Sequence, residues 1–301
     1  MNDIAASTPH FSYSHATLQN IANDVLDYAK KGGATACETD ISDGFGQNVT
    51  VRRNEVETIE YNRDKGLSVT VYIGQKRGHA SSSDFSSQAV RETVAAALSI
   101  ASHTAADSCA GLADATLLAH EVPDLDLYFP WILPVEQAIQ LAKSCEAAAF
   151  AVDKRISNSE GASVSLGQSQ FVYANSLGFM GGYPSSRHSI SCAVIASQND
   201  SMQRDYWYSV ARDPLDLEHA ESVGRKAGQR SVGRLGAKKI NTCEVPVLFE
   251  APLASSLIGH FVTAASGRGC IRRVACPTPS RRCNPGRRCC SRRRRLRPAA
   301  P

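Results

Sequence analysis

The stretch Val49-Thr-Val-Arg-Arg-Asn-Glu-Val-Glu-Thr-Ile-Glu-Tyr-Asn-Arg-Asp-Lys-Gly-Leu-Ser-Val-Thr-Val-Tyr-Ile73 decides the fold class, because its apolar residues recur near every second position. That period is typical of strands with one buried face. Three strands are predicted, at 49–51, 56–61 and 67–73. Turn-forming residues at 53–54, 64–66 and 74–78 separate and follow them, so the stretch predicts an antiparallel meander.

Helical patterns flank this meander on both sides. Before it, apolar residues recur at three and four positions from Leu18 to Ala29, and Gly32-Gly33 supplies the usual glycine stop. After it, the polar loop 79–84 offers capping side chains to a second helical pattern that ends near His103. The meander therefore belongs to a unit of helix, strands and helix.

The second half of the chain repeats this order without residue identity. Residues 135–150 predict an alanine-rich helix, and residues 215–235 predict a charged helix that closes the unit. Between the halves, three prolines interrupt any long element, so a surface linker is predicted whose apolar segment 125–133 packs back on a domain. The remaining strands are predicted at 156–169, 170–176, 189–197, 205–210 and 245–249.

The predicted fold class is α+β, with two successive helix/antiparallel-meander/helix units followed by the truncated start of a third, β-rich domain. Its parts are an N-terminal extension (1–15), a first α+β domain (16–104), a linker (105–134), a second α+β domain (135–236), the start of a third domain (243–267) and an Arg/Cys/Pro-rich tail (268–301).

A short, buried helix is predicted at 250–267, and it carries the one histidine placed as in a zinc-protease helix. Such a helix needs His-Glu and, one turn later, a second His, because two imidazoles bind the metal while the carboxylate activates water. Here Gly259 and Phe261 flank His260, and Ala265 stands where the second imidazole would fall. The prediction is a histidine packed on a core helix, with no catalytic residue and no metal ligand.

The net charge of +4 averages two unlike regions. Of the 33 basic residues, 12 are arginines after position 267, where no acidic residue occurs, so residues 1–267 hold 21 basic against 29 acidic side chains and a net charge of −8. No apolar run approaches the roughly 20 residues that span a bilayer. The N-terminal ten residues also lack a cationic start followed by an apolar block. A cytoplasmic protein with no membrane partner is therefore expected.

The tail 268–301 allows two accounts. Its arginine pairs and the run Arg292-Arg-Arg-Arg295 suit phosphate binding, but its five cysteines follow no metal-finger spacing and no aromatic residue is available for stacking. The composition of the tail has a second explanation. GC-rich coding DNA that is read in a wrong frame also gives Arg, Pro, Ala, Cys and Ser without Lys, Asp, Glu, Tyr or Phe. A frameshift near Gly267, removing most of a third domain, is the preferred hypothesis.

Five motifs occur in order along residues 15–267: Val51-Arg-Arg-Asn-Glu-Val-Glu-Thr-Ile-Glu-Tyr-Asn62, Gly78-His-Ala-Ser-Ser-Ser-Asp84, Asn158-Ser-Glu-Gly161, Tyr173-Ala-Asn-Ser-Leu-Gly-Phe179 and Phe249-Glu-Ala-Pro-Leu-Ala-Ser-Ser-Leu-Ile-Gly-His260. Together they resemble the TldD/PmbA family of bacterial peptidases, and specifically its PmbA (TldE) branch.

The resemblance implies a cytoplasmic two-subunit metallopeptidase that degrades or processes unstructured peptides. In that family the TldD-type subunit carries a zinc helix of the form His-Glu-x-x-x-His, so zinc is expected in a TldD-type partner and no cofactor in this chain. Gly259, His260, Phe261 and Ala265 are the positions equivalent to that helix. A PmbA-type subunit is therefore expected that is truncated and inactive alone.

Two other function classes stay open. The first is a nucleic-acid-associated protein that uses the basic tail, and the second is an autonomous hydrolase with an unrecognised site. A metal site assembled from distant segments also stays open. His79 and Asp84 have the residue types for activating a hydroxyl, but a Ser/Asp-rich segment before a helix is more often a cap. Gly44-Phe-Gly46 lacks the third glycine and the following helix of a phosphate loop.

Overall fold

The computed structural model describes residues 11–119 and 121–266. These fall into two compact units that divide between Ala237 and Lys238. The first unit holds the sheet and its helices, and the second holds one described helix. The tail 268–301 lies outside the described residues, so the frameshift and the basic nucleic-acid patch stay predictions.

The order helix, strands, helix occurs twice in the first unit. The first half comprises α1 (His15–Lys31), β1 (Ala36–Arg52), β2 (Glu55–Ile73), β3 (Lys76–Ser82) and α2 (Ser87–His103). After the 3-10 turn η1 (Ala115–Leu117), the second half comprises α3 (Val135–Phe150), β4 (Ile156–Asn175), β5 (Met180–Gly181), β6 (Pro184–Gln198), β7 (Ser201–Ala211), the 3-10 turn η2 (Pro214–Asp216) and α4 (Ala220–Gly233). The second unit contains α5 (Ala251–Ala265).

Side-chain caps begin the two helices of the first half. The Ser14 Oγ accepts a hydrogen bond from the Thr17 backbone N–H at the start of α1. The Ser86 Oγ accepts one from the Ala89 N–H at the start of α2, and the Asp84 carboxylate in turn accepts the Ser86 N–H at 2.8 Å. The cap of α2 is therefore Ser86, just after the predicted segment 79–84. Within that segment Asp84 supports the cap, whereas residues 79–82 belong to β3 and do not form a loop.

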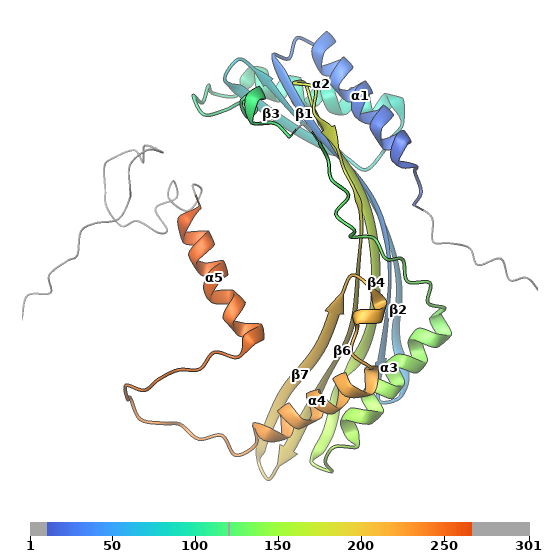
Figure 1. Ribbon diagram of the computed structural model, residues 1–301, viewed down its shortest axis with the longest axis vertical. Coiled ribbons are helices and arrows are strands. Elements are labelled where there is room, and N and C mark those ends of the chain that lie inside the picture. The colour runs from blue at the N-terminus through green and yellow to red at the C-terminus, as the bar shows by residue number, and fades with distance from the viewer. Residues whose placement is uncertain (1–10, 120, 267–301) are drawn as a thin grey trace, which may run out of the picture. The chain divides into compact units, whose positions relative to one another are not determined.

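All described strands belong to one sheet (Figure 1), in the order β3-β2-β1-β4-β6-β7, with β5 paired to the end of β4. The halves join through their first strands, because β1 and β4 pair antiparallel from Glu38 opposite Asn175 to Val51 opposite Ala162. The predicted α+β class is confirmed. The division into domains at 16–104 and 135–236 stays a prediction. In the structure, the strands of both segments form a single sheet.

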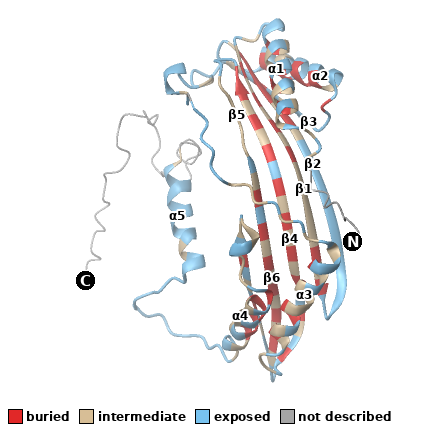
Figure 2. Ribbon diagram, turned by 45° about the vertical axis from the view of Figure 1, so that its right-hand side comes forward, coloured by how far each residue is buried: buried red, intermediate tan, exposed pale blue. Residues whose placement is uncertain are grey.

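Both helix pairs cover the same face of this sheet. In β1, Cys37 and Ile41 pack under α1 and α2, whereas Val49 and Val51 pack in the core under α3 and α4. All four are odd-numbered residues of one continuous strand, so their side chains point to one face. Figure 2 shows the buried residues alternating along the strands beneath the two helix pairs.

The linker covers the middle of that face, between the helix pairs. The Tyr128 hydroxyl donates to the Gln168 Oε1 at 2.7 Å, and the Phe129 N–H donates to the Ser186 Oγ at 2.9 Å. The Trp131 ring meets the buried His188 ring edge-on, with 5.5 Å between centroids. The prediction that segment 125–133 packs back on folded structure is therefore confirmed.

Two predicted strand breaks are wrong. Residues 64–66 are not a turn but continue β2, and the break between 169 and 170 lies inside β4. The polar residues at 64–66 stay extended because β1 pairs with them, Gly44 opposite Asp64 and Ser42 opposite Gly66. Their side chains are exposed or half-exposed, so they break the hydrophobic period without breaking the strand.

The predictions around α5 hold only in part. The helix is present, with Pro252 in its first turn, but the strand at 245–249 is absent, since no described strand lies there to pair with it. The predicted burial of the helix is not found among the described residues of its unit: α5 has no buried residue there, and Leu253, Leu257 and Phe261 are 56%, 48% and 72% exposed. No helix among the described residues is long and apolar enough to cross a membrane.

Candidate functional site

The positions equivalent to a zinc helix lie on the last two turns of α5. His260 and Phe261 are exposed, and the Gly259 carbonyl accepts the Thr263 hydroxyl at 2.8 Å. The residues of Ala251–Ala265 include no Asp, no Glu and no histidine besides His260. This helix therefore offers one imidazole, whereas a catalytic zinc needs three protein ligands and a neighbouring base.

Three other described histidines contact residues that are not metal ligands. His188 is buried under Trp131, His79 contacts the Thr70 hydroxyl across β2 and β3, and His103 contacts the Ser99 carbonyl on α2. Within residues 11–119 and 121–266, no group of three His, Cys, Asp or Glu side chains lies close enough to hold a metal ion.

A shallow hollow of about 560 Å³ lies on the sheet. Three glycines on the face without helices leave the backbone there uncovered by side chains. Gly46 of β1 lies opposite Gly167 of β4, and Gly44, two residues from Gly46, lies on the same face. Serine side chains border the hollow on β4 and β6, with Arg187 and Arg212 on one side and Asn62 and Asp64 on the other. The arrangement suits a polar, extended chain with charged ends. It presents no nucleophile paired with a base.

A carboxylate bracketed by two phenols lies on the same face, towards the α1/α2 end. The Tyr72 and Tyr173 hydroxyls donate to the two Glu38 oxygens at 3.0 and 2.9 Å. Burial, and then the hydrogen bond to Glu38, raises the pKa of Tyr72 to about 12. Burial also raises the pKa of Tyr173 and that of the neighbouring Asp40 carboxyl. The phenols therefore stay protonated near neutral pH, and their hydrogen bonds to Glu38 tie β1, β2 and β4 together.

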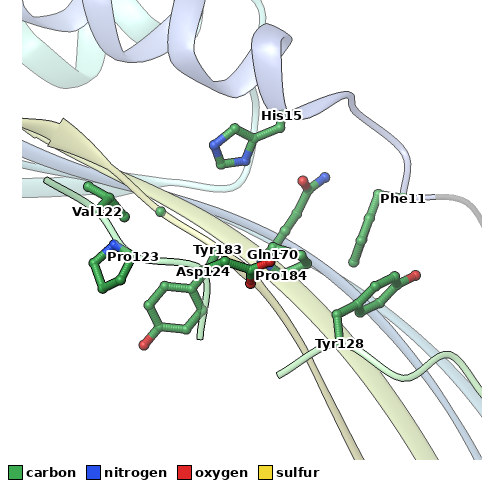
Figure 3. A pocket seen from close by; sticks show the side chains of 10 residues that line it. Phe11, His15, Val122, Pro123, Asp124, Tyr128, Gln170, Tyr183 and Pro184 are labelled. Carbon is green, nitrogen blue, oxygen red and sulfur yellow. The ribbon is translucent and has the colours of Figure 1, made fainter. Parts of the chain in front are cut away.

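A second pocket, of about 530 Å³, lies between the start of α1 and the linker (Figure 3). Phe11 and Tyr128 form one wall, with ring centroids 5.7 Å apart, and His15 and Gln170 also line the pocket. The Gln170 Nε2 donates to the Tyr13 carbonyl at 2.6 Å, so this side chain already anchors the N-terminal segment. The pocket therefore consists largely of residues that fix the linker and the N-terminal segment.

Sequence reasoning missed the Glu38 cluster and the glycine hollow. Both depend on β1 starting at Ala36, and residues 36–48 carry few apolar residues. The signal available was the alternation of Ser and Gly with larger residues in β1 and β4, which is typical of a sheet with one polar face.

Two family models match the chain. Residues 37–101 match the PmbA/TldA metallopeptidase domain 1, and residues 128–235 match the PmbA/TldA metallopeptidase central domain. The chain belongs to this metallopeptidase family.

Its curated relatives place it on the PmbA (TldE) branch. It is 42% identical to Metalloprotease PmbA of Escherichia coli O157:H7 over 85% of this chain and 57% of that protein. It is 39% identical to the Metalloprotease PmbA homolog of Haemophilus influenzae over 89% of this chain and 59% of that protein. The chain thus spans little more than half the length of these relatives.

Solved structures share the fold. A putative modulator of DNA gyrase from Bacteroides thetaiotaomicron superposes with a TM-score of 0.79 at 23% identity, covering 85% of this chain and 58% of that one. TldE from Thermococcus kodakarensis gives a TM-score of 0.55 at 13% identity, covering 70% of this chain and 47% of that one.

Proposed function

We propose that this chain is the non-catalytic, PmbA-type subunit of a zinc peptidase whose TldD-type partner carries the metal. The observation that carries the proposal is α5, where His260 has neither a following Glu nor a second His. A lone imidazole cannot hold zinc with an open position and activate its water. The chemistry is therefore assigned to a second chain, with a cytoplasmic location for the complex.

We assign to the complex the processing of unstructured peptides. The hollow around Gly44, Gly46 and Gly167 supports this substrate class, because an extended chain can lie against a surface without side chains. Arg187 and Arg212 would attract acidic groups of such a chain, and Asp64 would attract basic ones.

The test is co-expression with a TldD-type chain that contains His-Glu-x-x-x-His. We expect the two chains to co-purify and to hydrolyse an unfolded, fluorescently labelled casein, with all activity lost to a chelator and restored by zinc. This chain alone, supplied with zinc, should give no hydrolysis.

Matched variants separate the two chains. His260→Ala should leave the rate of the complex unchanged within about twofold, because ligands lost from a true zinc site cost far more. Changing the first histidine of the partner's zinc helix to alanine should abolish the rate. Hydrolysis by this chain alone that disappears in His260→Ala would contradict the proposal.

A further inference from the structure

The outer edge of β2 is half uncovered. β2 pairs with β1 along its whole length, but β3 pairs only with Leu67–Ile73. Within the described chain, Glu55–Gly66 therefore has no strand on its outer side, and residues 55–65 are exposed. In an antiparallel ladder every second residue of such a strand turns its N–H and C=O outward. A long exposed edge of this kind is a template for another strand.

Apolar side chains lie along this edge, on the face that carries the helices. Val56, Ile59 and Tyr61 are 41%, 44% and 65% exposed, and Ile59 lies opposite the buried Val49 of β1. Figure 2 shows this part of β2 as exposed, beside strands whose residues under α3 are buried. A further strand with apolar residues on that face would cover these side chains.

The charges of the edge favour an antiparallel copy of itself. Its first part carries three acidic residues, Glu55, Glu57 and Glu60, whereas its last part carries the basic residues Arg63 and Lys65 around one Asp. Antiparallel self-pairing brings the acidic part of one copy opposite the basic part of the other. Parallel pairing would set acid against acid, and like charges directly opposite destabilise a sheet.

We propose that Glu55–Gly66 pairs antiparallel with the same segment of a second copy of this chain, about a two-fold axis at Tyr61. This register places Ile59 of one copy opposite Arg63 of the other, so that the arginine stem covers the isoleucine. The cross-strand pairs are Tyr61–Tyr61, Ile59–Arg63, Glu60–Asn62 and Thr58–Asp64. Beyond Thr58 a β-bulge at Glu57 shifts the register of β2 and ends the regular pairing.

A neighbouring register is less favourable. An axis at Glu60 would set the two Glu60 carboxylates directly opposite each other. In the Tyr61 register no like charges face one another, and the most exposed aromatic ring of the edge is paired with itself. The pairing does not rest on the peptidase role, since it uses neither α5 nor the hollow.

Sedimentation velocity on the full chain tests the association. We expect a reversible dimer that forms below about 100 μM and that Tyr61→Asp weakens at least tenfold. The matched control is Tyr206→Asp on β7, the opposite edge of the sheet, where an exposed tyrosine is also replaced. This control should leave the dimer intact, and circular dichroism should show both variants folded.

A chain that stays monomeric at about 100 μM would overturn the proposal. So would a dimer that Tyr61→Asp leaves intact or that both variants weaken equally. If the wild-type chain is monomeric but Tyr61→Asp abolishes binding to a TldD-type chain, the edge belongs to that chain and the second copy is excluded.

Cysteine cross-linking tests the register. In a background with Cys109, Cys243 and the five tail cysteines changed to Ser, Tyr61→Cys should form an inter-chain disulfide on mild oxidation. Directly opposite residues have Cβ atoms about 4.5–5.5 Å apart, close to disulfide reach. Arg63→Cys should not cross-link, because its two copies are offset by four residues, roughly 13 Å along the strands. Equal cross-linking of the two variants would exclude the Tyr61 register.

Discussion

The two helix-covered ends of the sheet reach close packing by different contacts. At the first end, Gly78 of β3 lets α2 approach the sheet, since a Cβ there would lie 2.0 Å from the Ala97 carbonyl oxygen. At the second end, Gly224 of α4 lets that helix rest on α3, since a Cβ there would lie 1.9 Å from the Cys145 carbonyl oxygen. Both ends have the same order of helix, strands and helix. Their close packing depends on a strand–helix contact at the first end and on a helix–helix contact at the second.

The largest expected effect comes from filling these two contacts. Gly78→Ala and Gly224→Ala should each lower the free energy of unfolding by about 3 kcal/mol, because backbone rather than a flexible side chain must move. The control is Gly233→Ala at the end of α4, where a Cβ would meet nothing within 4 Å. It should be neutral or stabilising by up to about 1 kcal/mol. Urea unfolding followed by circular dichroism measures all three.

Fluorescence tells whether the ends unfold together. Both tryptophans, Trp131 and Trp207, pack at the second end. Because β1 and β4 belong to one sheet, we expect Gly78→Ala to shift the tryptophan transition as much as the circular dichroism transition. A tryptophan transition that stays at its wild-type position would show that the two ends unfold independently.

The next effect concerns a buried carboxylate that ties the halves together. Glu146 of α3 is 2% exposed, and its two oxygens accept the Arg53 and Asn54 backbone N–H groups at 2.9 and 2.8 Å. These two turn residues have positive φ, 52° and 63°. Glu146→Ala should cost about 2–3 kcal/mol, because it leaves two donors of a tight turn without their acceptor.

A control on the same helix separates charge from the turn contact. Glu136→Gln in the exposed first turn of α3 should change stability by no more than about 0.5 kcal/mol. The corresponding β2–β3 turn is held by a hydroxyl, since the Gly74 N–H donates to the Thr35 Oγ1 at 3.0 Å. Thr35→Ala should cost only about 1 kcal/mol. A larger loss from Thr35→Ala than from Glu146→Ala would reverse the ranking of the two ends.

The sequence predicted the elements whose buried residues recur at a regular spacing. It missed the elements that depend on contacts between residues far apart in the sequence. The helix over residues 135–150 was readable because its apolar spacing and flanking Pro134 are local signals. β1 was missed before Val49, because its residues 36–48 owe their extended form to pairing with β2 and β4. The α5 motif could be judged from sequence alone, since ligand types at i and i+4 are local. The Glu38 cluster joins β1, β2 and β4, so no spacing in the chain reveals it.

A smaller effect is expected at the Glu38 cluster. Tyr72→Phe removes the hydrogen bond to the Glu38 Oε1 and should cost about 1 kcal/mol at pH 7. The pKa of Tyr72 is raised from 10.0 to about 12, so its protonated form stabilises the fold below pH 10 and this contribution is lost as the pH rises towards 12. The variant should therefore lose less stability between pH 10 and 12 than the wild type. Tyr61→Phe, at a 65% exposed ring, should follow the wild-type profile.

The smallest effect is expected at His188, beneath the linker. Burial lowers the pKa of this imidazole from 6.5, and its Nε2 lies 2.9 Å from the Phe129 carbonyl oxygen, as suits a neutral ring that donates there. Its buried Nδ1 has no hydrogen-bond partner among the described residues, so a second proton would be unpaired. The unfolded chain therefore binds a proton more readily below pH 6.5, and stability should fall as the pH drops from 7 to 5.

His188→Gln should flatten that fall, because the replacement can still donate to the Phe129 carbonyl but does not titrate. His103→Gln, on the exposed end of α2, should keep the wild-type slope. The measurement is the free energy of unfolding in urea between pH 5 and 7. If His188→Gln keeps the wild-type dependence on pH, the acid sensitivity comes from other groups. The protonation state of His188 then does not contribute to holding the linker over the sheet.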